Sequence, residues 1–300
     1  MSLIAFVLVV ISAILHACWN IFGKKVSPTV AFFTLAFLAG VLPLTPVALP
    51  LAVGNLGLLE DLLPYLLISG ICQAIYSASL ALAYAKGEIS VAYPLARALP
   101  VLLVAWLSAW IGLQTLSEPL AYLGIVLVLL GALLLPMKHF RDFRFSLYSN
   151  RCTAFALLAA FATAGYSVVD KLAIDITNRT LDISALEIAC LYIWLEGVSA
   201  SIFLLLGQGW SPRLRHALWT LIRTDKLAIS AAGFMITLTY LLVLWAMQYS
   251  ENLSYVVALR QLSIPVGALL GAFLFKEFIG PTKLSALVLL CIGLSLVILV

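Results

Sequence analysis

Residues 83–105 read AYAKGEISVAYPLARALPVLLVA, and residues 246–268 read AMQYSENLSYVVALRQLSIPVGA. Each stretch carries a single arginine within an apolar segment, Arg97 in the first and Arg260 in the second. In one alignment without gaps, Ala83, Glu88, Arg97 and Ala105 match Ala246, Glu251, Arg260 and Ala268. We interpret this match as an internal duplication, because arginine is rare within apolar segments and two in register are an unusual coincidence.

The composition around these stretches is that of a membrane protein. Of the 300 residues, 64% are hydrophobic and 10% are charged, whereas soluble domains average about 45–50% and about 25%. This excludes an ordinary soluble enzyme, a disordered chain and a secreted disulfide scaffold. The net charge of +4 comes from lysines and arginines in short scattered loops, so it does not indicate nucleic-acid binding. The five cysteines and three histidines show no metal-ligand spacing, and we expect neither a metal nor a cofactor.

Ten apolar segments are long enough to cross a hydrocarbon core, which needs roughly 20 residues of helix. They are 3–22, 29–50, 62–85, 90–112, 118–136, 152–174, 183–206, 227–248, 253–275 and 281–299. Helix is the expected state, because open strands cannot satisfy their backbone hydrogen bonds in lipid. The first segment lacks a basic start and a cleavage site, so we expect a retained helix and not a signal peptide. The sequence therefore predicts an all-α integral membrane protein with ten transmembrane helices.

The basic residues predict an orientation. Thirteen lysines and arginines fall in the odd-numbered loops, whereas the even-numbered loops hold only Lys171 and Arg179. The positive-inside rule then places the odd loops in the cytoplasm. We expect a multi-pass protein of the cell (inner) membrane with both termini extracytoplasmic.

The starts of the two halves also match. Residues 16–24, with His16, Trp19, Asn20 and Lys24, align with residues 163–171, which end at Lys171. We predict two repeats, 1–145 and 146–300, of five helices each. An odd number of helices per repeat makes the two copies inverted relative to each other, a 5+5 arrangement typical of secondary transporters.

Three motifs carry a resemblance to a known family. They are His16-Ala17-x-Trp19-Asn20-x-x-x-Lys24, the stretch 93–100 (YPLARALP), and Ala258-Leu259-Arg260-Gln261-x-Ser263 followed by Lys276-Glu277. Together they resemble the EamA family of the drug/metabolite transporter (DMT) superfamily. The resemblance implies ten helices, two EamA-type halves, and export or exchange of small metabolites. The chain departs from the family's Gly-Glu pattern at 116–118 and at 276–277.

Arg97 and Arg260 are the strongest functional signals. A charged side chain near the bilayer centre costs about 2.5–3.5 kcal/mol on insertion scales, so it persists where it faces water, an acid or an anionic ligand. A guanidinium group suits bidentate binding of a carboxylate or phosphate. The alternative is a permanent ion pair with an internal acid such as Glu196. Glu196 itself is either that fixed counter-ion or a residue that exchanges protons as the coupling ion.

Polar stripes on several helices complete the candidate site. The stripes face the bundle interior, because lipid does not tolerate them; they either line a path or hold helices together. The candidate substrate-binding residues are Arg97, Arg260, Tyr93, Tyr76, Tyr240, Trp19, Asn20 and Tyr166, and the candidate coupling or gating residues are Glu196, His16, Lys24, Asp170 and Lys171. For the two lysines the alternative is snorkelling to the interface. Pro94, Pro100 and Pro265 are expected to interrupt the helices around the arginines, and Gly267 with Gly271 predicts close helix packing.

No catalytic constellation or ATP-binding motif stands out, so we expect a transporter and not an enzyme. The favoured function is secondary active export or exchange of a small anionic or zwitterionic metabolite, such as an amino acid or organic acid, by alternating access. The alternatives are an ion channel or carrier and a flippase of lipid-linked intermediates from the same superfamily. The expected partners are the substrate, the lipid bilayer and protons, in a monomer or homodimer, without nucleic acid.

Overall fold

The computed structural model describes residues 2–26, 29–86, 89–113, 119–135, 137, 139–140, 150–275 and 280–299. Within these ranges it gives the side chains of all residues except 20–26, 84, 86, 89–95, 272, 275, 298 and 299.

The described chain consists of helices and connections, without a β-strand. In chain order the helices are α1 (Leu3–Val26), α2 (Val30–Val41), η1 (Leu42–Leu44), α3 (Thr45–Gly54), α4 (Leu56–Lys86), α5 (Ile89–Trp110), α6 (Pro119–Leu134), α8 (Arg151–Thr180), α9 (Ala185–Gln208), α10 (Pro212–Thr224), α11 (Lys226–Met247), α12 (Leu253–Leu259), η3 (Arg260–Leu262), α13 (Ser263–Phe275) and α14 (Pro281–Leu299). Each predicted apolar segment is helical in its described residues.

Two of the predicted segments are not single helices. Segment 29–50 forms α2, the 3₁₀ turn η1 and α3, with prolines 43, 46 and 50 in or just after the bend. Segment 253–275 forms α12, η3 and α13, and the 3₁₀ turn begins at Arg260. Pro265 lacks the N–H that would bond the carbonyl of Gln261, which explains the tightened turn. The expected break at Pro94 and Pro100 is wrong, because α5 runs through both as one α-helix.

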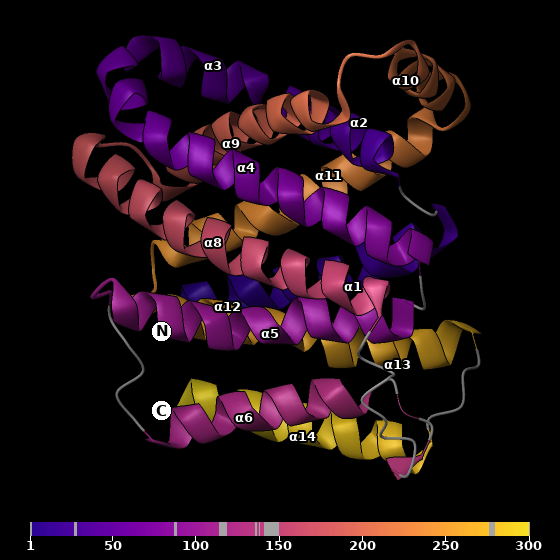
Figure 1. Ribbon diagram of the computed structural model, residues 1–300. Helices are drawn as coiled ribbons and strands as arrows, with labels where there is room; N and C mark the ends of the chain where they lie inside the picture. Colours follow the sequence, from indigo (N-terminus) through magenta and orange to yellow (C-terminus); the bar gives the residue numbers. More distant parts are fainter. Residues whose placement is uncertain are drawn as a thin grey trace.

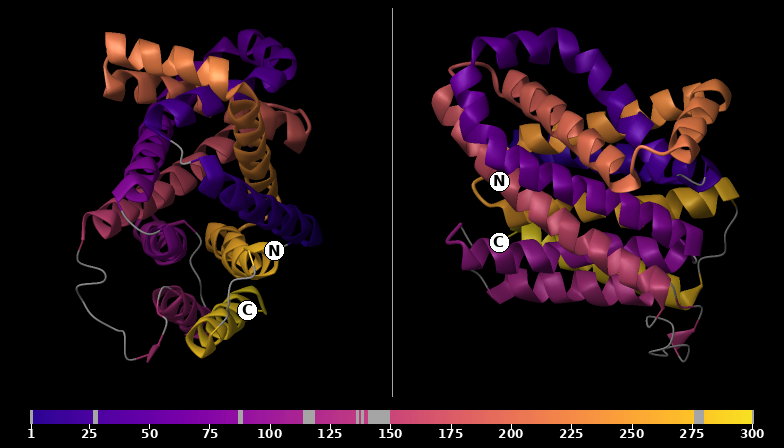
Figure 2. Two further views of the ribbon diagram at one scale, coloured as in Figure 1. Left: turned by 90° about the vertical axis from the view of Figure 1, so that its right-hand side faces the viewer. Right: turned by 45° about the horizontal axis from the view of Figure 1, so that its top comes forward.

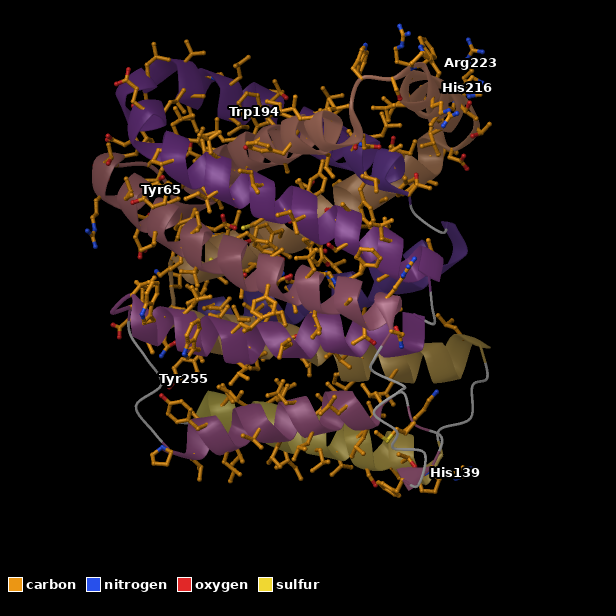
Figure 3. All side chains as sticks on the ribbon, in the orientation of Figure 1. Tyr65, His139, Trp194, His216, Arg223 and Tyr255 are labelled. Carbon is orange, nitrogen blue, oxygen red and sulfur yellow. The ribbon has the colours of Figure 1, made fainter. Side chains whose placement is uncertain are left out.

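The polar connection at 207–226, between two of the predicted apolar segments, contains the helix α10. Ser211 caps it by accepting a hydrogen bond from the backbone N–H of Leu214 at 3.2 Å, and proline occupies the first helical position. One face of α10 is apolar and the other carries arginines, and Leu214 is its one buried residue. Figure 3 shows His216 and Arg223 on this outlying helix, away from the main bundle.

Six helical stretches within the described residues are long and apolar enough to cross a membrane. They are Val30–Gly54, Leu56–Ala83, Arg151–Thr180, Ala185–Gln208, Lys226–Met247 and Leu253–Gly271. Four shorter apolar helical stretches are Leu3–Trp19, Ala96–Trp110, Pro119–Leu134 and Pro281–Val297. Large apolar side chains are exposed on the outside of the bundle, among them Ile4, Ile68, Leu123 and Val288. So much exposed hydrocarbon is typical of a surface covered by lipid, and the protein is an all-helical, membrane-type protein.

The helices run roughly along one direction, with both chain termini at the end opposite α10 (Figures 1 and 2). α6 and α14 pack on each other as a pair below α5 and α13 (Figure 1). In the rest of the bundle, α4 packs on α8 and α9, α5 on α8, α1 on α11 and α13, and α2 on α11 and α9.

Glycines allow a close crossing of α6 and α14. A Cβ atom placed on Gly124 of α6 would lie 2.6 Å from the carbonyl oxygen of Gly293 on α14, and a Cβ on Gly293 would lie 2.6 Å from the carbonyl oxygen of Gly124. The two backbones are therefore in contact, as small residues allow in membrane proteins. Gly267, in contrast, has space for a methyl group, because a Cβ placed on it would lie 3.8 Å from the Ala17 Cβ of α1. α13 therefore packs on α1 at Gly267 at ordinary van der Waals distance, without a backbone contact like that of α6 and α14.

Candidate transport site

A cavity of about 50 Å³ lies where the predicted halves meet. It is large enough for a few water molecules, each of which needs about 10–15 Å³ on this measure. Its lining comes from α1, α2 and α4 on one side and from α8, α11 and η3 on the other: His16, Trp19, Phe33, Phe37, Gln73, Tyr76, Ser77, Leu80, Tyr166, Ile236, Tyr240 and Arg260. The apolar end of this lining, with the two phenylalanines of α2, was not predicted, because apolar residues of a membrane helix give no functional signal.

Arg260 is the cation of this cavity. Its residue is 5% exposed, and its Nη1 atom has no hydrogen-bond partner among the described residues. The guanidinium carbon lies 5.2 Å from the ring centroid of Tyr240, within cation–π distance. A buried guanidinium with an unused donor, facing a cavity, is arranged to bind an acceptor that enters from outside the chain.

Arg97 has a different environment from Arg260, although both are 5% exposed. Its Nη2 atom donates to the backbone carbonyl of Arg260 at 3.3 Å and to Ser263 Oγ at 2.9 Å. The 3₁₀ turn η3 brings both acceptors to one side of the chain, so Arg97 of α5 holds this turn in place. The structure thus brings the two arginines together. Arg260 lines the cavity, whereas Arg97 is hydrogen-bonded to the turn that carries Arg260.

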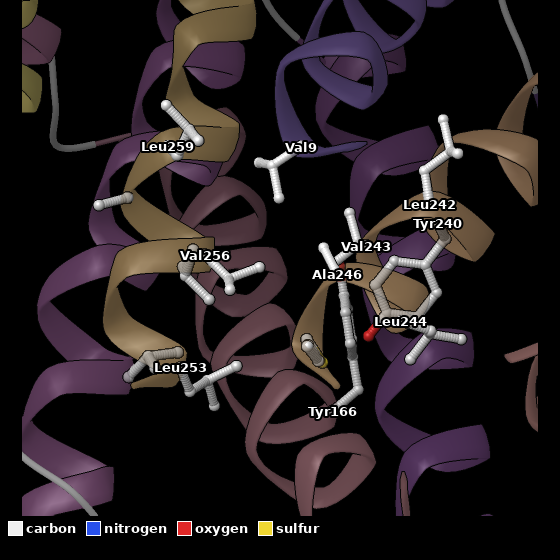
Figure 4. Packing of buried hydrophobic residues seen from close by; sticks show 14 of the residues in the cluster. Val9, Tyr166, Tyr240, Leu242, Val243, Leu244, Ala246, Leu253, Val256 and Leu259 are labelled. Atoms are coloured by element: carbon white, nitrogen blue, oxygen red, sulfur yellow. The ribbon is translucent and has the colours of Figure 1, made fainter. Parts of the chain in front are cut away.

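Three tyrosines predicted at the site form a row of edge-to-face rings. The ring centroids of Tyr76 and Tyr166 are 6.0 Å apart, and those of Tyr166 and Tyr240 are 5.4 Å apart. Figure 4 shows Tyr166 of α8 and Tyr240 of α11 next to each other. All three line the cavity, together with the predicted Trp19 and His16. Aromatic rings with polar tips suit a pocket that accepts both apolar and polar parts of a ligand.

Asp170 and Glu196 lie together, and neither is paired with a cation in the described part of the chain. Asp170 is fully buried and Glu196 is 2% exposed. Ser69 Oγ lies 2.5 Å from Asp170 Oδ1 and 3.1 Å from Glu196 Oε1. Neither carboxyl group forms an ion pair with an arginine, lysine or histidine of the described chain, so the expected alternative of a Glu196–arginine pair does not occur in this structure.

Neighbouring side chains donate to both carboxyl groups. Tyr192 donates to Asp170 Oδ1 at 2.8 Å, and Tyr240 donates to Asp170 Oδ2. Gln73 Nε2 donates to Glu196 Oε1 at 2.8 Å. Ser69 and Gln73 stand one helical turn apart on α4, which is a signal that sequence reasoning could have used to place both on one face.

Lys171 lies inside the bundle, but its ammonium group is not paired with the carboxylate of Asp170. Its Nζ forms an ion pair with Asp175 at 2.8 Å and donates to the backbone carbonyl of Met247 at 3.1 Å. Met247 ends α11, where a positive charge stabilises the free carbonyls. The expected inward stripe on α8 is confirmed, since Thr163, Tyr166, Ser167, Asp170 and Lys171 are all buried. The side chains of Asn20, Lys24 and Tyr93 lie outside the described residues.

Comparison with known proteins defines the fold but no family. No protein-family model matches the chain, and no curated protein matches it. Eighteen solved chains match it in structure. One of them, described only as "Crystal structure of protein", superposes with a TM-score of 0.68 over 97% of this chain and 96% of its own, at 17% sequence identity. The chain therefore shares its helical fold, over nearly its whole length, with an experimentally solved protein.

Proposed function

We propose that the protein is a secondary transporter that moves a small anionic or zwitterionic metabolite, such as an amino acid or organic acid, by alternating access. The observation that carries this proposal is Arg260: a buried guanidinium with an unused donor, beside a cavity lined by helices from both halves of the chain. A carboxylate is the natural counterpart, since it accepts hydrogen bonds from the planar fork of an arginine. The aromatic and aliphatic remainder of the lining suits the apolar part of such a molecule.

The helix packing supports ten spans in a 5+5 inverted repeat. If 1–145 and 146–300 are equivalent, α1 corresponds to α8, α4 to α11, α5 to α12–α13, and α6 to α14. The contact of α4 with α8 then has its counterpart in α11 with α1, and the contact of α5 with α8 in α13 with α1. The pair α6–α14 is its own counterpart. Contacts that exchange in this way are expected of two similar units related by a pseudo-twofold axis.

The ends of the bundle support the proposed orientation. Both termini lie at one end, and α10, with its arginines, lies at the other (Figures 1 and 2). An even number of spans puts both termini on the same side. The positive-inside rule makes the α10 end cytoplasmic and the termini extracytoplasmic, in the cell (inner) membrane.

The motifs around His16, Arg97 and Arg260 support membership of the EamA family of the DMT superfamily. Of the predicted binding residues, Trp19, Tyr76, Tyr166, Tyr240 and Arg260 line the cavity, and we assign them to the substrate. The proposal is a carrier with no catalytic step and no cofactor.

Counterflow in proteoliposomes tests the proposal. Vesicles preloaded with one member of a panel of amino acids and small organic acids should accumulate the same labelled compound transiently and saturably, which a channel does not do. Arg260→Gln should abolish this counterflow, and Arg260→Lys should weaken it, because lysine keeps the charge but loses the fork. Arg223→Gln, which removes an exposed arginine of α10, is the matched control and should transport normally. Normal counterflow by Arg260→Gln, or a flux that does not saturate, would defeat the assignment.

A further inference from the structure

Asp170 and Glu196 are two like-charged groups in one buried site. Both are shielded from solvent, and one hydroxyl group, that of Ser69, lies within hydrogen-bond distance of both. No cation of the described chain is paired with either carboxyl group. Two ionised carboxylates that both lie within hydrogen-bond distance of one hydroxyl group repel each other strongly where water is absent. The arrangement therefore favours a pair that shares one proton, as in other buried carboxyl dyads.

The hydrogen count at Ser69 agrees with one bound proton. The hydroxyl has a single hydrogen, but its oxygen is close to oxygen atoms of both carboxyl groups. Its shorter contact, 2.5 Å to Asp170 Oδ1, accounts for that hydrogen, and a proton on the carboxyl side can satisfy the longer contact, 3.1 Å to Glu196 Oε1. Asp170 accepts from Tyr192 and Tyr240 in addition to Ser69, which stabilises its charged form. Glu196 is therefore the better place for the proton.

A separate observation connects this pair to the cavity. Tyr240 donates its hydroxyl to Asp170, and the face of its ring lies 5.2 Å from the guanidinium carbon of Arg260. Gln73 donates to Glu196 and also lines the cavity. Asp170 is thus linked through Tyr240 to Arg260, whose Nη1 has no partner in the described chain, and Glu196 is linked to the cavity through Gln73.

We propose that Asp170 and Glu196 together bind the coupling proton, and that this proton and an anion at Arg260 each favour the binding of the other. The inference rests on the proposed function and names the coupling ion of the same site. While the cavity is empty, the positive charge of Arg260 favours loss of the proton from the pair. An anion neutralises that charge, so the pair takes up a proton from the aqueous side to which the cavity is open. The proton leaves to water with the anion on the other side.

The other groups around the pair are compatible with this role. Tyr192 of α9 and Tyr240 of α11 are neutral donors, the thiol of Cys72 of α4 lies against Gly165 of α8, and Arg260 of η3 is the charged group beyond Tyr240. A metal cation would need several oxygen acceptors directed at one point. Here Ser69, Gln73 and the two tyrosines direct donors at the carboxyl oxygens, so a proton fits the site and a metal ion does not.

Infrared spectroscopy of the purified protein in lipid nanodiscs tests the bound proton without any substrate. The wild type should show the C=O stretching band of a protonated carboxyl group at neutral pH, and Glu196→Gln should lose it. Glutamine has the shape of protonated glutamic acid, and its amide oxygen can replace Oε1 as the acceptor for both Ser69 and Gln73, so this variant should fold. Glu187→Gln is the control: it makes the same change on the same helix at an exposed position where glutamine preserves the capping box. A band that survives in Glu196→Gln, or that disappears in Glu187→Gln, would overturn the assignment.

Binding of acetate, followed by the fluorescence of Trp19 in the cavity, tests the coupling. Acetate should bind the wild type about tenfold more tightly at about pH 6 than at about pH 8.5, a coupling of ordinary size. Glu196→Gln should bind acetate with the same affinity at both pH values. If the wild type shows no pH dependence while Arg260→Gln abolishes binding, the coupling inference fails and the proposed function stands. If Arg260→Gln binds acetate normally, the proposed function fails, and the infrared band alone decides whether the pair holds a proton. A requirement for sodium that Glu196→Gln removes would identify a metal cation and refute the proton.

Discussion

Replacing either of the two buried arginines by methionine should abolish transport, but the two replacements should differ in their effect on stability. Because both residues are 5% exposed, the free energy of burying a guanidinium group is similar for both and cancels when the variants are compared. Arg97→Met removes two charge-assisted hydrogen bonds, at 2.9 and 3.3 Å. At about 1.5–3 kcal/mol for each bond to a charged group, and taking the low end because one bond is long, the loss is about 3 kcal/mol.

Arg260→Met removes less, because the Nη1 atom of Arg260 has no hydrogen-bond partner in the described chain and its other contacts are with the tyrosines of the cavity. It loses the cation–π contact with Tyr240, about 1 kcal/mol for a partly desolvated pair. The two variants should therefore differ by about 2 kcal/mol in the free energy of unfolding. For a chain of this size about 1 kcal/mol corresponds to about 2 °C, so Arg97→Met should melt about 4 °C below Arg260→Met.

Thermal unfolding of the detergent-purified variants, followed by size-exclusion chromatography after heating, measures this difference. Arg260→Met should remain folded but fail in counterflow, whereas Arg97→Met should lose both stability and transport. The reasoning is refuted if Arg260→Met melts at or below the temperature of Arg97→Met, because the cavity cation would then be the structural anchor.

Four further substitutions probe the packing of the helices. Gly124→Leu should destabilise the α6–α14 pair by about 1–3 kcal/mol, because its side chain meets the backbone of Gly293; Gly267→Ala, where a methyl group has space, should melt like the wild type in the same thermal assay. Pro265→Ala should restore the missing backbone N–H and favour a regular α-helix at η3, so it should slow counterflow without lowering the melting temperature, and unchanged transport would contradict a role for the 3₁₀ turn. Lys171→Met should lower the melting temperature by about 2 °C, because it removes a partly buried ion pair and a helix-end contact; no change would mean that the lysine contributes nothing to stability.

The helical class and the positions of the apolar segments could be predicted from the sequence because both depend on local composition. The inward stripe on α8 could be predicted for the same reason, since lipid excludes polar side chains from the outer surface. The partner of each polar group could not be predicted. Lys171 and Asp170 are adjacent in the sequence, but successive helical residues point about 100° apart. The structure turns Lys171 to Asp175 and Met247, and Asp170 to Ser69 and the tyrosines.

Proline positions also predicted the breaks in the helices poorly, because the effect of a proline depends on packing neighbours that cannot be identified from the sequence. Pro94 and Pro100 leave α5 continuous, whereas Pro265 accompanies a 3₁₀ turn that Arg97 holds from another helix. The free carbonyl near a proline is tolerated only where a donor satisfies it. At η3 the N–H of Ser263 points to the carbonyl of Gln261, which Pro265 leaves free, and the guanidinium group of Arg97, from the matching position of the other half, donates to the neighbouring carbonyl of Arg260.

The two arginines occupy matching positions in the sequence but make different contacts in the structure, and this difference has a physical reason. Both arginines could bind a ligand in the cavity only if both guanidinium groups pointed into it. In the structure, Arg97 instead donates to the Arg260 carbonyl and to Ser263, and this fixes the turn from which the Arg260 side chain reaches the cavity. With this turn held by Arg97, the Arg260 guanidinium lies over the ring of Tyr240, and the Tyr240 hydroxyl donates to Asp170. A change of charge at Arg260 can therefore affect the carboxyl pair through the ring of Tyr240. This is the connection that coupling between an anion and a proton requires.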